Sequence, residues 1–168
     1  MTDQEKQQFF KNMKTFLALA KNELGIEKLP KIIWILDSDN TGQTSFGGFV
    51  LKTQAIRIVL KNRHPNDVMR TLAHELVHYK QWTENRLDAT SGDDGSAEEN
   101  EANAKAGVIM RQFNRGNPDS FSMKALSEGS KMIQAIDPKS LDSIYGIQAY
   151  DRDKKVLKKK KDAAADSV

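Results

Sequence analysis

The chain has 168 residues, of which 38% are hydrophobic and 29% are charged, and its formal net charge is +3. This length suits one domain with its own core and leaves little room for a second. The absence of cysteine excludes disulfides and thiolate metal ligands, and no run of residues predicts a membrane span. The polar first residues lack a secretory signal pattern, so we expect a cytoplasmic protein with no membrane partner.

The first predicted elements are a helix and three strands. From Gln4 to Leu24 apolar residues recur at helical spacing, and Gly25 follows where a C-cap is expected. Short runs rich in β-branched and aromatic residues then predict strands over residues 31–39, 44–53 and 54–62. Three short strands after one helix favour a small, mainly antiparallel sheet.

Two more helices are predicted after the strands. Pro65 suits a first helical turn, and the chain runs on to Leu87 without a helix breaker, with a wide apolar stripe typical of a buried helix. Ser96, followed three residues later by Glu99, is a capping-box signal for a helix over residues 97–113. The predicted fold class is therefore α+β: an N-terminal helix, a three-stranded sheet and two packed helices.

We expect one domain over residues 1–150, with a core at about 5–113 and a C-terminal extension over 114–150. Residues 151–168 contain the run DRDKKVLKKKK, which predicts a solvated, disordered tail. The alternative for this tail is attraction to nucleic acid, which would make binding strongly dependent on salt. The sequence offers no aromatic-studded basic surface to support that alternative.

The stretch TLAHELVHYKQ, residues 71–81, carries the clearest chemical pattern. Residues four apart lie on one face of a helix, so His74 and His78 can direct two imidazole nitrogens at a single Zn²⁺ ion. Zn²⁺ lowers the pKa of a bound water towards about 7, and Glu75, next to His74, is placed to accept its proton as general base. The alternative is that the two histidines and the glutamate are buried for structural reasons only. In that case three ionisable groups would be buried without evident polar partners.

A catalytic zinc site needs a third protein ligand and one open position. No histidine follows His78, and His64, near the start of the helix, is too distant and is expected to cap the helix or lie at the surface. The candidates are therefore Glu98, Glu99 and Glu101, although carboxylates at a helix N-terminus also stabilise the helix dipole. Glu101 adjoins the predicted buried face and is the predicted ligand, with Glu98 as the alternative. That face comprises Ala102, Ala106, Ile109 and Phe113.

The motifs HELVH at 74–78 and NEANAKAG at 100–107 resemble those of the gluzincin metallopeptidases, which include thermolysin-like enzymes, minigluzincins and ImmA/IrrE-type proteins. The order of elements over residues 5–113 also resembles the minimal gluzincin core. The phrase FGGFVLKTQAIRIVLKN is similar to small zinc peptidase domains encoded by tailed phages and to SprT-like domains. If the chain is phage-encoded, its location would be the host cytoplasm.

The resemblance implies a zinc-dependent peptidase acting on a peptide or protein substrate. It implies His74, His78 and Glu101 as zinc ligands and Glu75 as general base. It also implies that an edge strand binds an extended peptide, and we expect the run QAIRIVL to be that strand.

The chain departs from this family in two ways. Thermolysin-like enzymes have an aspartate four residues after the ligand glutamate, where this chain has Lys105, so we expect Asn103 or a backbone carbonyl to orient the first histidine. SprT-like proteases use a third histidine that is missing here, so their DNA-repair role is not implied. The donor to the reaction's oxyanion is also unassigned. Its candidates are Tyr79, Tyr145 and Tyr150.

Two alternatives concern the activity itself. Residues 121–150 could fold over the cleft and occlude it. The protein could also be a zinc-containing binding or regulatory module with little hydrolysis. The presence of Glu75 argues against such a module, because a purely structural metal site has no use for a general base.

Overall fold

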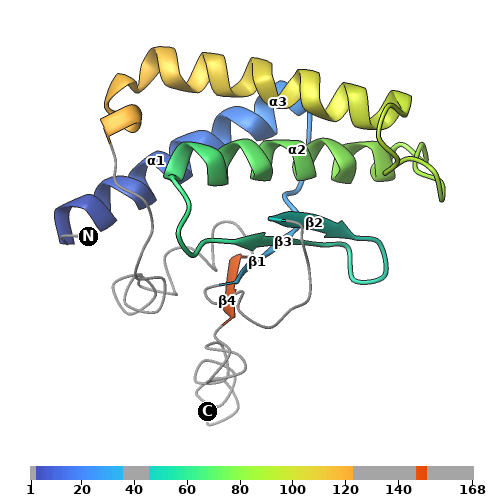
Figure 1. Ribbon diagram of the computed structural model, residues 1–168, viewed down its shortest axis with the longest axis horizontal. Helices are drawn as coiled ribbons and strands as arrows, with labels where there is room; N and C mark the ends of the chain where they lie inside the picture. Colours follow the sequence, from blue (N-terminus) through green and yellow to red (C-terminus); the bar gives the residue numbers. More distant parts are fainter. Residues whose placement is uncertain (1–2, 36–45, 123–146, 151–168) are drawn as a thin grey trace, which may run out of the picture.

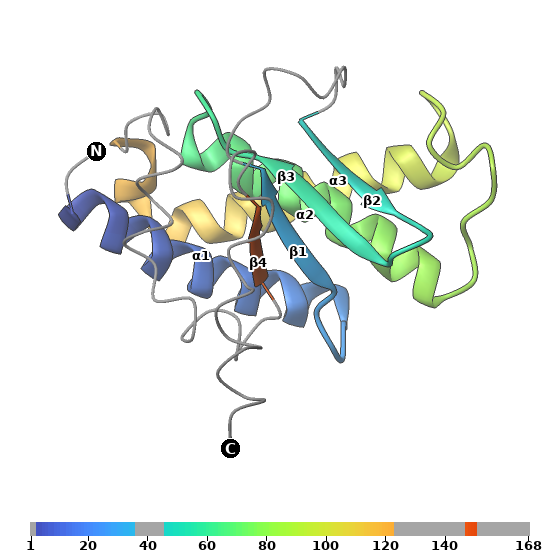
Figure 2. The ribbon, with the colours of Figure 1, turned by 90° about the horizontal axis from the view of Figure 1, so that it is seen from below.

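The computed structural model describes residues 3–35, 46–122 and 147–150. Its elements are α1 (Asp3–Leu24), β1 (Lys31–Ile35), β2 (Gly47–Val50), β3 (Ala55–Val59), α2 (Pro65–Thr83), α3 (Ala97–Gly116), the 3-10 helix η1 (Pro118–Ser122) and β4 (Ile147–Tyr150). The helices lie together on one face of the sheet, with α2 and α3 side by side (Figures 1 and 2). Within these ranges, no helix is both long and apolar enough to cross a membrane.

The strands form a mixed sheet in the order β2-β3-β1-β4. β2 and β3 form an antiparallel pair, whereas β1 is parallel to both β3 and β4. The three expected strands and the α+β class are confirmed, but the expectation of a mainly antiparallel sheet was wrong. After β1, the chain forms β2 at the edge of the sheet. It then reverses direction, and β3 occupies the position between β2 and β1. Two reversals of direction therefore leave β1 and β3 parallel.

The expected end of α1 and the expected start of α2 are confirmed. After α1, Gly25 adopts a φ of 59°, and the N–H of Ile26 donates to the carbonyl of Lys21 at 3.0 Å, as in a Schellman cap. At the start of α2, the imidazole Nδ1 of His64 accepts a hydrogen bond from the N–H of Asn66 at 3.1 Å. His64 is thus a helix cap, with Pro65 in the first turn.

The connection from α2 to α3 begins earlier than the sequence predicts. α2 ends at Thr83 instead of Leu87, and Asn85 adopts a φ of 55°, which does not continue a helix. Ser96 then caps α3, because its hydroxyl oxygen accepts a hydrogen bond from the N–H of Glu99 at 3.1 Å.

The core lies between the helices and the sheet, and α2 contacts α1, α3, β2 and β3. Phe16 of α1 packs edge to face on Phe113 of α3, with ring centroids 5.5 Å apart. From α2, Leu72 and Leu76 are fully buried on either side of the first histidine of the motif. Burial of these leucines fixes the rotation of α2, so His74 and His78 face α3 and the edge of the sheet.

A buried arginine holds β2 close to α2. Arg63 is 5% exposed and donates hydrogen bonds to the carbonyl oxygens of Phe46 and Val59, to the carboxylate of Asp67 and to the hydroxyl of Thr71. At Gly47 the two elements are so close that an added Cβ would lie 2.5 Å from Cγ2 of Thr71. Only glycine fits there without displacing a neighbour, so β2 runs directly beside the motif helix.

Several expectations concern segments outside the described residues. The basic tail, residues 151–168, is one of them. Of the C-terminal extension, the structure describes the end of α3, η1 and the backbone of β4. The proposed covering of the cleft by residues 121–150 therefore falls largely on undescribed positions.

Candidate metal centre

His74, His78 and Glu99 form a group that could hold a metal ion. The Nε2 atoms of the two histidines are 3.0 Å apart, and they lie 3.2 and 3.1 Å from the two carboxylate oxygens of Glu99. Ligands of a tetrahedral zinc ion with bonds of about 2.0–2.1 Å are separated by about 3.3–3.4 Å. The three side chains are therefore spaced like ligands of one ion.

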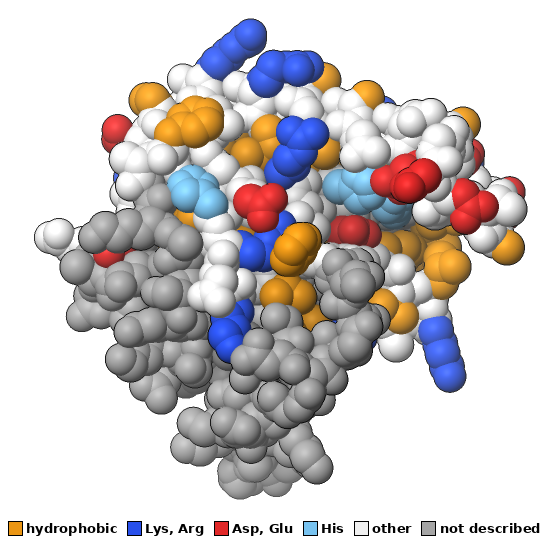
Figure 3. Space-filling model, in the orientation of Figure 1, with side chains coloured by type: hydrophobic (Ala, Val, Ile, Leu, Met, Phe, Trp, Pro, Cys, Tyr) orange, Lys and Arg blue, Asp and Glu red, His pale blue; other side chains and the backbone are white. Residues whose placement is uncertain are grey.

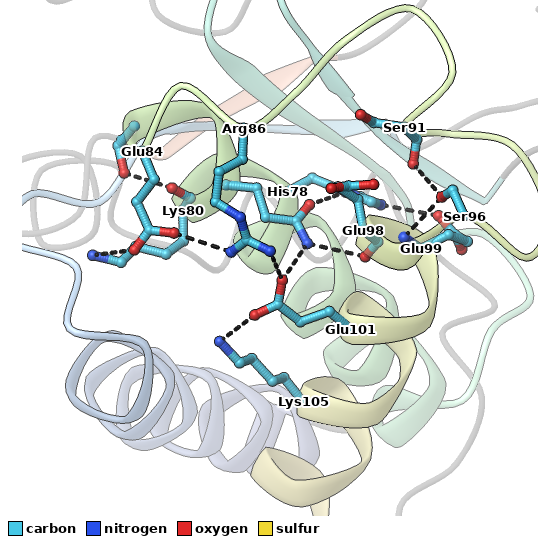
Figure 4. Close-up of polar contacts among 12 residues, drawn as sticks. His78, Lys80, Glu84, Arg86, Ser91, Ser96, Glu98, Glu99, Glu101 and Lys105 are labelled. Atoms are coloured by element: carbon cyan, nitrogen blue, oxygen red, sulfur yellow. Dashed lines mark hydrogen bonds and ion pairs between the residues drawn. The ribbon is translucent and has the colours of Figure 1, made fainter.

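The glutamate beside the histidines is Glu99, and Glu101 lies elsewhere. The carboxylate of Glu101 pairs with Arg86 and Lys105 and accepts a hydrogen bond from Gln81 (Figure 4). The hydrogen bonds from Arg86 and Lys105 lower the pKa of Glu101 to about 2. Among the described residues, neither Glu101 nor the alternative Glu98 belongs to the group that could hold a metal. The structure thus replaces Glu101 with Glu99 as the candidate third ligand.

The sequence favours Glu101 over Glu99 because Glu101 adjoins the buried face predicted for this helix. The backbone N–H of Glu99 does bond to Ser96, but its side chain turns to the histidines, while the N–H of Ser96 donates to the carbonyl of Asp93. The signal in the sequence was helical spacing. Glu99 continues the buried stripe of α3 by one turn, and the stripe comprises Ala102, Ala106, Ile109, Met110 and Phe113.

Gln81 fixes the orientation of His78, a role that the sequence analysis missed. Gln81 is fully buried, and its Nε2 donates to the carbonyl of Glu98 and the carboxylate of Glu101, both at 2.9 Å. Both partners only accept hydrogen bonds, so this end of the amide is its nitrogen. Oε1 of Gln81 must then accept from Nδ1 of His78, 2.9 Å away. With its proton on Nδ1, His78 presents the lone pair of Nε2 to the site.

Asn103 lies beside the other histidine. Its side-chain nitrogen donates to Oε1 of Glu99 at 3.3 Å, and its contact with His74 acts to raise the pKa of that imidazole. Burial lowers the pKa of His74 and outweighs the raising effects of Glu99 and Asn103. His74 is therefore biased to the neutral form, which a metal ligand must adopt.

Glu75, the expected general base, is 7% exposed. Burial raises its pKa to about 7, although His78 and the backbone N–H of Phe49 in β2 both act to lower it. A carboxylate with a pKa close to neutrality can both accept and return a proton near pH 7. The hydrogen bond to Phe49 also ties Glu75 to the outer side of β2.

No protein-family model, curated protein or solved structure matches this chain. The resemblance to gluzincins therefore rests on the sequence motifs and on the order of the predicted elements.

Two pockets flank Glu75 and His74. The larger, about 520 Å³, is lined by Gly47, Phe49, Leu51, His74, Glu75, His78, Leu87, Asp88, Ala89, Ser91, Gly92 and Glu99. The smaller, about 290 Å³, is lined by Phe46, Gly47, Asp67, Arg70, Thr71, His74, Glu75, Asn103 and Ala106. Figure 3 shows histidine surface over α2, with acidic and hydrophobic side chains beside it. The candidate metal centre is therefore open to solvent from two directions.

The strand beside the pockets is β2, which corrects the expectation for QAIRIVL. That run forms β3, which is paired on both sides inside the sheet and cannot accept another strand. β2 forms the edge, and its residues Gly47 and Phe49 line the pockets.

The tyrosines considered as oxyanion donors lie elsewhere or outside the described residues. The hydroxyl of Tyr79 donates to the carbonyl of Lys28 at 3.1 Å, and its ring packs with Phe49 and Trp82. Burial raises the pKa of Tyr79. Tyr150 belongs to β4, at the sheet edge opposite to β2, and Tyr145 is not among the described residues.

Proposed function

We propose that this protein is a zinc-dependent metallopeptidase, which hydrolyses peptide bonds. The observation that carries the proposal is the position of Glu75, buried beside three convergent ligand groups and between two pockets. A structural zinc site is normally closed by four protein ligands, whereas a catalytic site has three and keeps one position open. The described residues supply three.

The nature of the ligands favours zinc. Two imidazoles and one carboxylate, without thiolates, match the ligand set of hydrolytic zinc sites. When bound, Zn²⁺ supplies Lewis acidity that polarises a water molecule and the substrate carbonyl. Gln81 holds His78 in the tautomer that binding requires, and burial keeps His74 neutral.

Glu75 is assigned the proton transfers. Its carboxylate accepts a proton from the attacking water and then delivers it to the nitrogen of the leaving amine. In the metal-free protein, burial raises the pKa of Glu75 to about 7, so the carboxyl group can exchange a proton near neutral pH.

β2 is assigned the binding of substrate. An exposed sheet edge can take an extended peptide as an additional strand, and the open side of β2 is the side on which the N–H of Phe49 bonds to Glu75. Gly47 and Phe49 line the pockets, so a peptide along β2 would pass across Glu75 and the histidines.

Three neighbouring glutamates provide matched variants for a test. Zinc content by mass spectrometry is expected to be about one ion in the wild type and Glu75→Gln and strongly reduced in Glu99→Gln, and Glu101→Gln should retain more zinc than Glu99→Gln. Cleavage of a mixed peptide library, read by mass spectrometry, is expected for the wild type and should be lost in Glu75→Gln.

Two outcomes would contradict the proposal. Full zinc retention by Glu99→Gln, with loss in Glu101→Gln, would overturn the ligand assignment. A zinc-loaded wild type that binds peptides but cleaves none would identify a binding module instead of a peptidase.

A further inference from the structure

The smaller pocket differs in charge from the larger one. It lies on the side of Glu75 towards the start of α2, and two of its lining residues, Asp67 and Arg70, carry charges of opposite sign. The side chains beyond Glu75 and the histidines decide which substrate residues fit on each side of the scissile bond.

The negative charge of Asp67 in this pocket is already neutralised. The carboxylate of Asp67 lies 2.6 Å from the guanidinium of Arg63, which is buried and hydrogen-bonded to backbone carbonyls. Arg70, in contrast, is exposed and has no hydrogen bond or ion pair with any other residue that the structure describes. Counting only partners among the described residues, the pocket therefore presents one cation that is not paired with an acidic side chain.

The larger pocket is lined by more apolar surface than the smaller one. Phe49, Leu51 and Leu87 line it with apolar surface. Its one acidic residue on the loop, Asp88, accepts hydrogen bonds from Thr90 and Ser91, which lower the pKa of Asp88 and hold its carboxylate at the loop. The three apolar side chains offer a surface on which an apolar substrate side chain can pack.

We infer that Arg70 forms a subsite for a carboxylate of the substrate peptide, opposite an apolar subsite in the larger pocket. This inference rests on the proposed function, since it names the class of substrate for the same site. Arg70 precedes His74 by one helical turn, which is about 6 Å along the axis. An extended peptide advances about 3.3 Å per residue, so the carboxylate would lie about two residues from the scissile bond.

The carboxylate has two possible sources, which are an acidic side chain or the free C-terminus of a short peptide. Guanidinium recognises either one through paired N–H donors. Two series of peptides separate these sources. The first is a nonapeptide with a central Phe and an amidated C-terminus, in which Glu, Gln or Lys stands two residues before or after the Phe. The second is a neutral pentapeptide whose C-terminus is either free or amidated.

Binding to zinc-loaded Glu75→Gln protein, followed by fluorescence anisotropy, tests the subsite without cleavage. We expect one carboxylate position to improve affinity about fivefold over its neutral counterpart, a modest gain because Arg70 is exposed. Adding Arg70→Gln should remove this preference, and Arg70→Glu should transfer it to the Lys peptide. Arg111→Gln is the control, since Arg111 is an exposed arginine of α3 that lines neither pocket.

Equal binding of the Glu and Gln peptides, or a preference that survives Arg70→Glu, would overturn the subsite. Cleavage of the same peptides by the wild type separates this result from the proposed function. Cleavage without a charge preference would support the peptidase activity and refute the Arg70 subsite. Selective binding without cleavage would support the subsite and refute the peptidase activity. If none of the peptides binds, both are refuted.

Discussion

Oε1 of Gln81 lies 2.9 Å from Nδ1 of His78, and the amide nitrogen of Gln81 is held by two groups that only accept hydrogen bonds. The orientation of a buried amide thus decides the tautomer of an imidazole at the candidate metal centre. This orientation is maintained by a series of hydrogen bonds that runs from Glu101 through Gln81 to His78. Glu101, the predicted ligand, therefore influences the site indirectly, through Gln81.

Replacement of Gln81 tests this relationship. In Gln81→Leu the imidazole loses its acceptor and the tautomer is no longer fixed, so zinc affinity should fall by about 10- to 100-fold. Titration with a competing chelator measures the affinity, and ¹⁵N NMR of the metal-free protein should show His78 protonated on Nδ1 in the wild type alone. Gln112→Leu, at an exposed position on α3, is the control. Unchanged affinity in Gln81→Leu would refute the positioning role.

The close approach of β2 to α2 predicts different effects at two adjacent glycines. In Gly47→Ala the new methyl group would lie 2.5 Å from Cγ2 of Thr71 and 3.1 Å from Cδ1 of Ile58, so the strand or helix must shift. Overpacking of this kind costs about 1–3 kcal/mol of unfolding free energy. Gly48→Ala meets no atom within 4 Å and should leave stability unchanged or slightly higher. Urea denaturation compares the two. Equal stabilities would show that β2 does not press on α2.

Arg63 and Asp67 form an ion pair, and the two residues should contribute unequally to the free energy of unfolding. Arg63→Met removes a buried side chain that donates to three backbone carbonyls and Thr71, and should cost about 2–3 kcal/mol of unfolding free energy. Asp67→Asn removes only the exposed partner, 56% exposed, and should cost less than about 1 kcal/mol. Similar losses from both variants, measured by chemical denaturation, would argue that the ion pair matters more than the backbone contacts.

The ion pairs of Glu101 predict a pH dependence of stability. Arg86 and Lys105 lower the pKa of Glu101 from its ordinary 4.5 to about 2 in the folded state. Folding is therefore favoured by the charged carboxylate above about pH 4.5, and this contribution is lost as the pH falls towards 2. Glu101→Gln should be less stable than the wild type at pH 7, and the difference should shrink below pH 4. Urea unfolding of both metal-free proteins between pH 7 and 3 measures it. A constant difference would contradict the assignment.

Local signals in the sequence predicted the elements well. His64 before Pro65 marks the start of α2, Ser96 marks the start of α3, and Gly25 marks the end of α1, because each supplies a specific capping group or backbone conformation. The spacing of His74 and His78 likewise needs only a helix to bring their nitrogens together. Such features depend on neighbours in the chain and can be read from it.

Features that depend on distant segments were not predicted. The position of β3 between β2 and β1 is set by how the hairpin docks on β1, and no short pattern encodes that choice. The choice between Glu99 and Glu101 depends on the rotation of α3 against α2. Lys105 lies one helical turn after Glu101, which the predicted helix already implies, but the sequence alone does not show that Arg86 also pairs with Glu101.

The candidate ligands come from two helices, α2 and α3, and this affects folding. Since His78 and Glu99 are 21 residues apart, a metal ion held by both would close a loop of that length. A covalent cross-link around such a loop would reduce the entropy of the unfolded chain by an amount worth about 3 kcal/mol at room temperature. In a chain without cysteine, the ion would therefore serve as a reversible staple between α2 and α3, and its removal should loosen the connection between them before it unfolds the core.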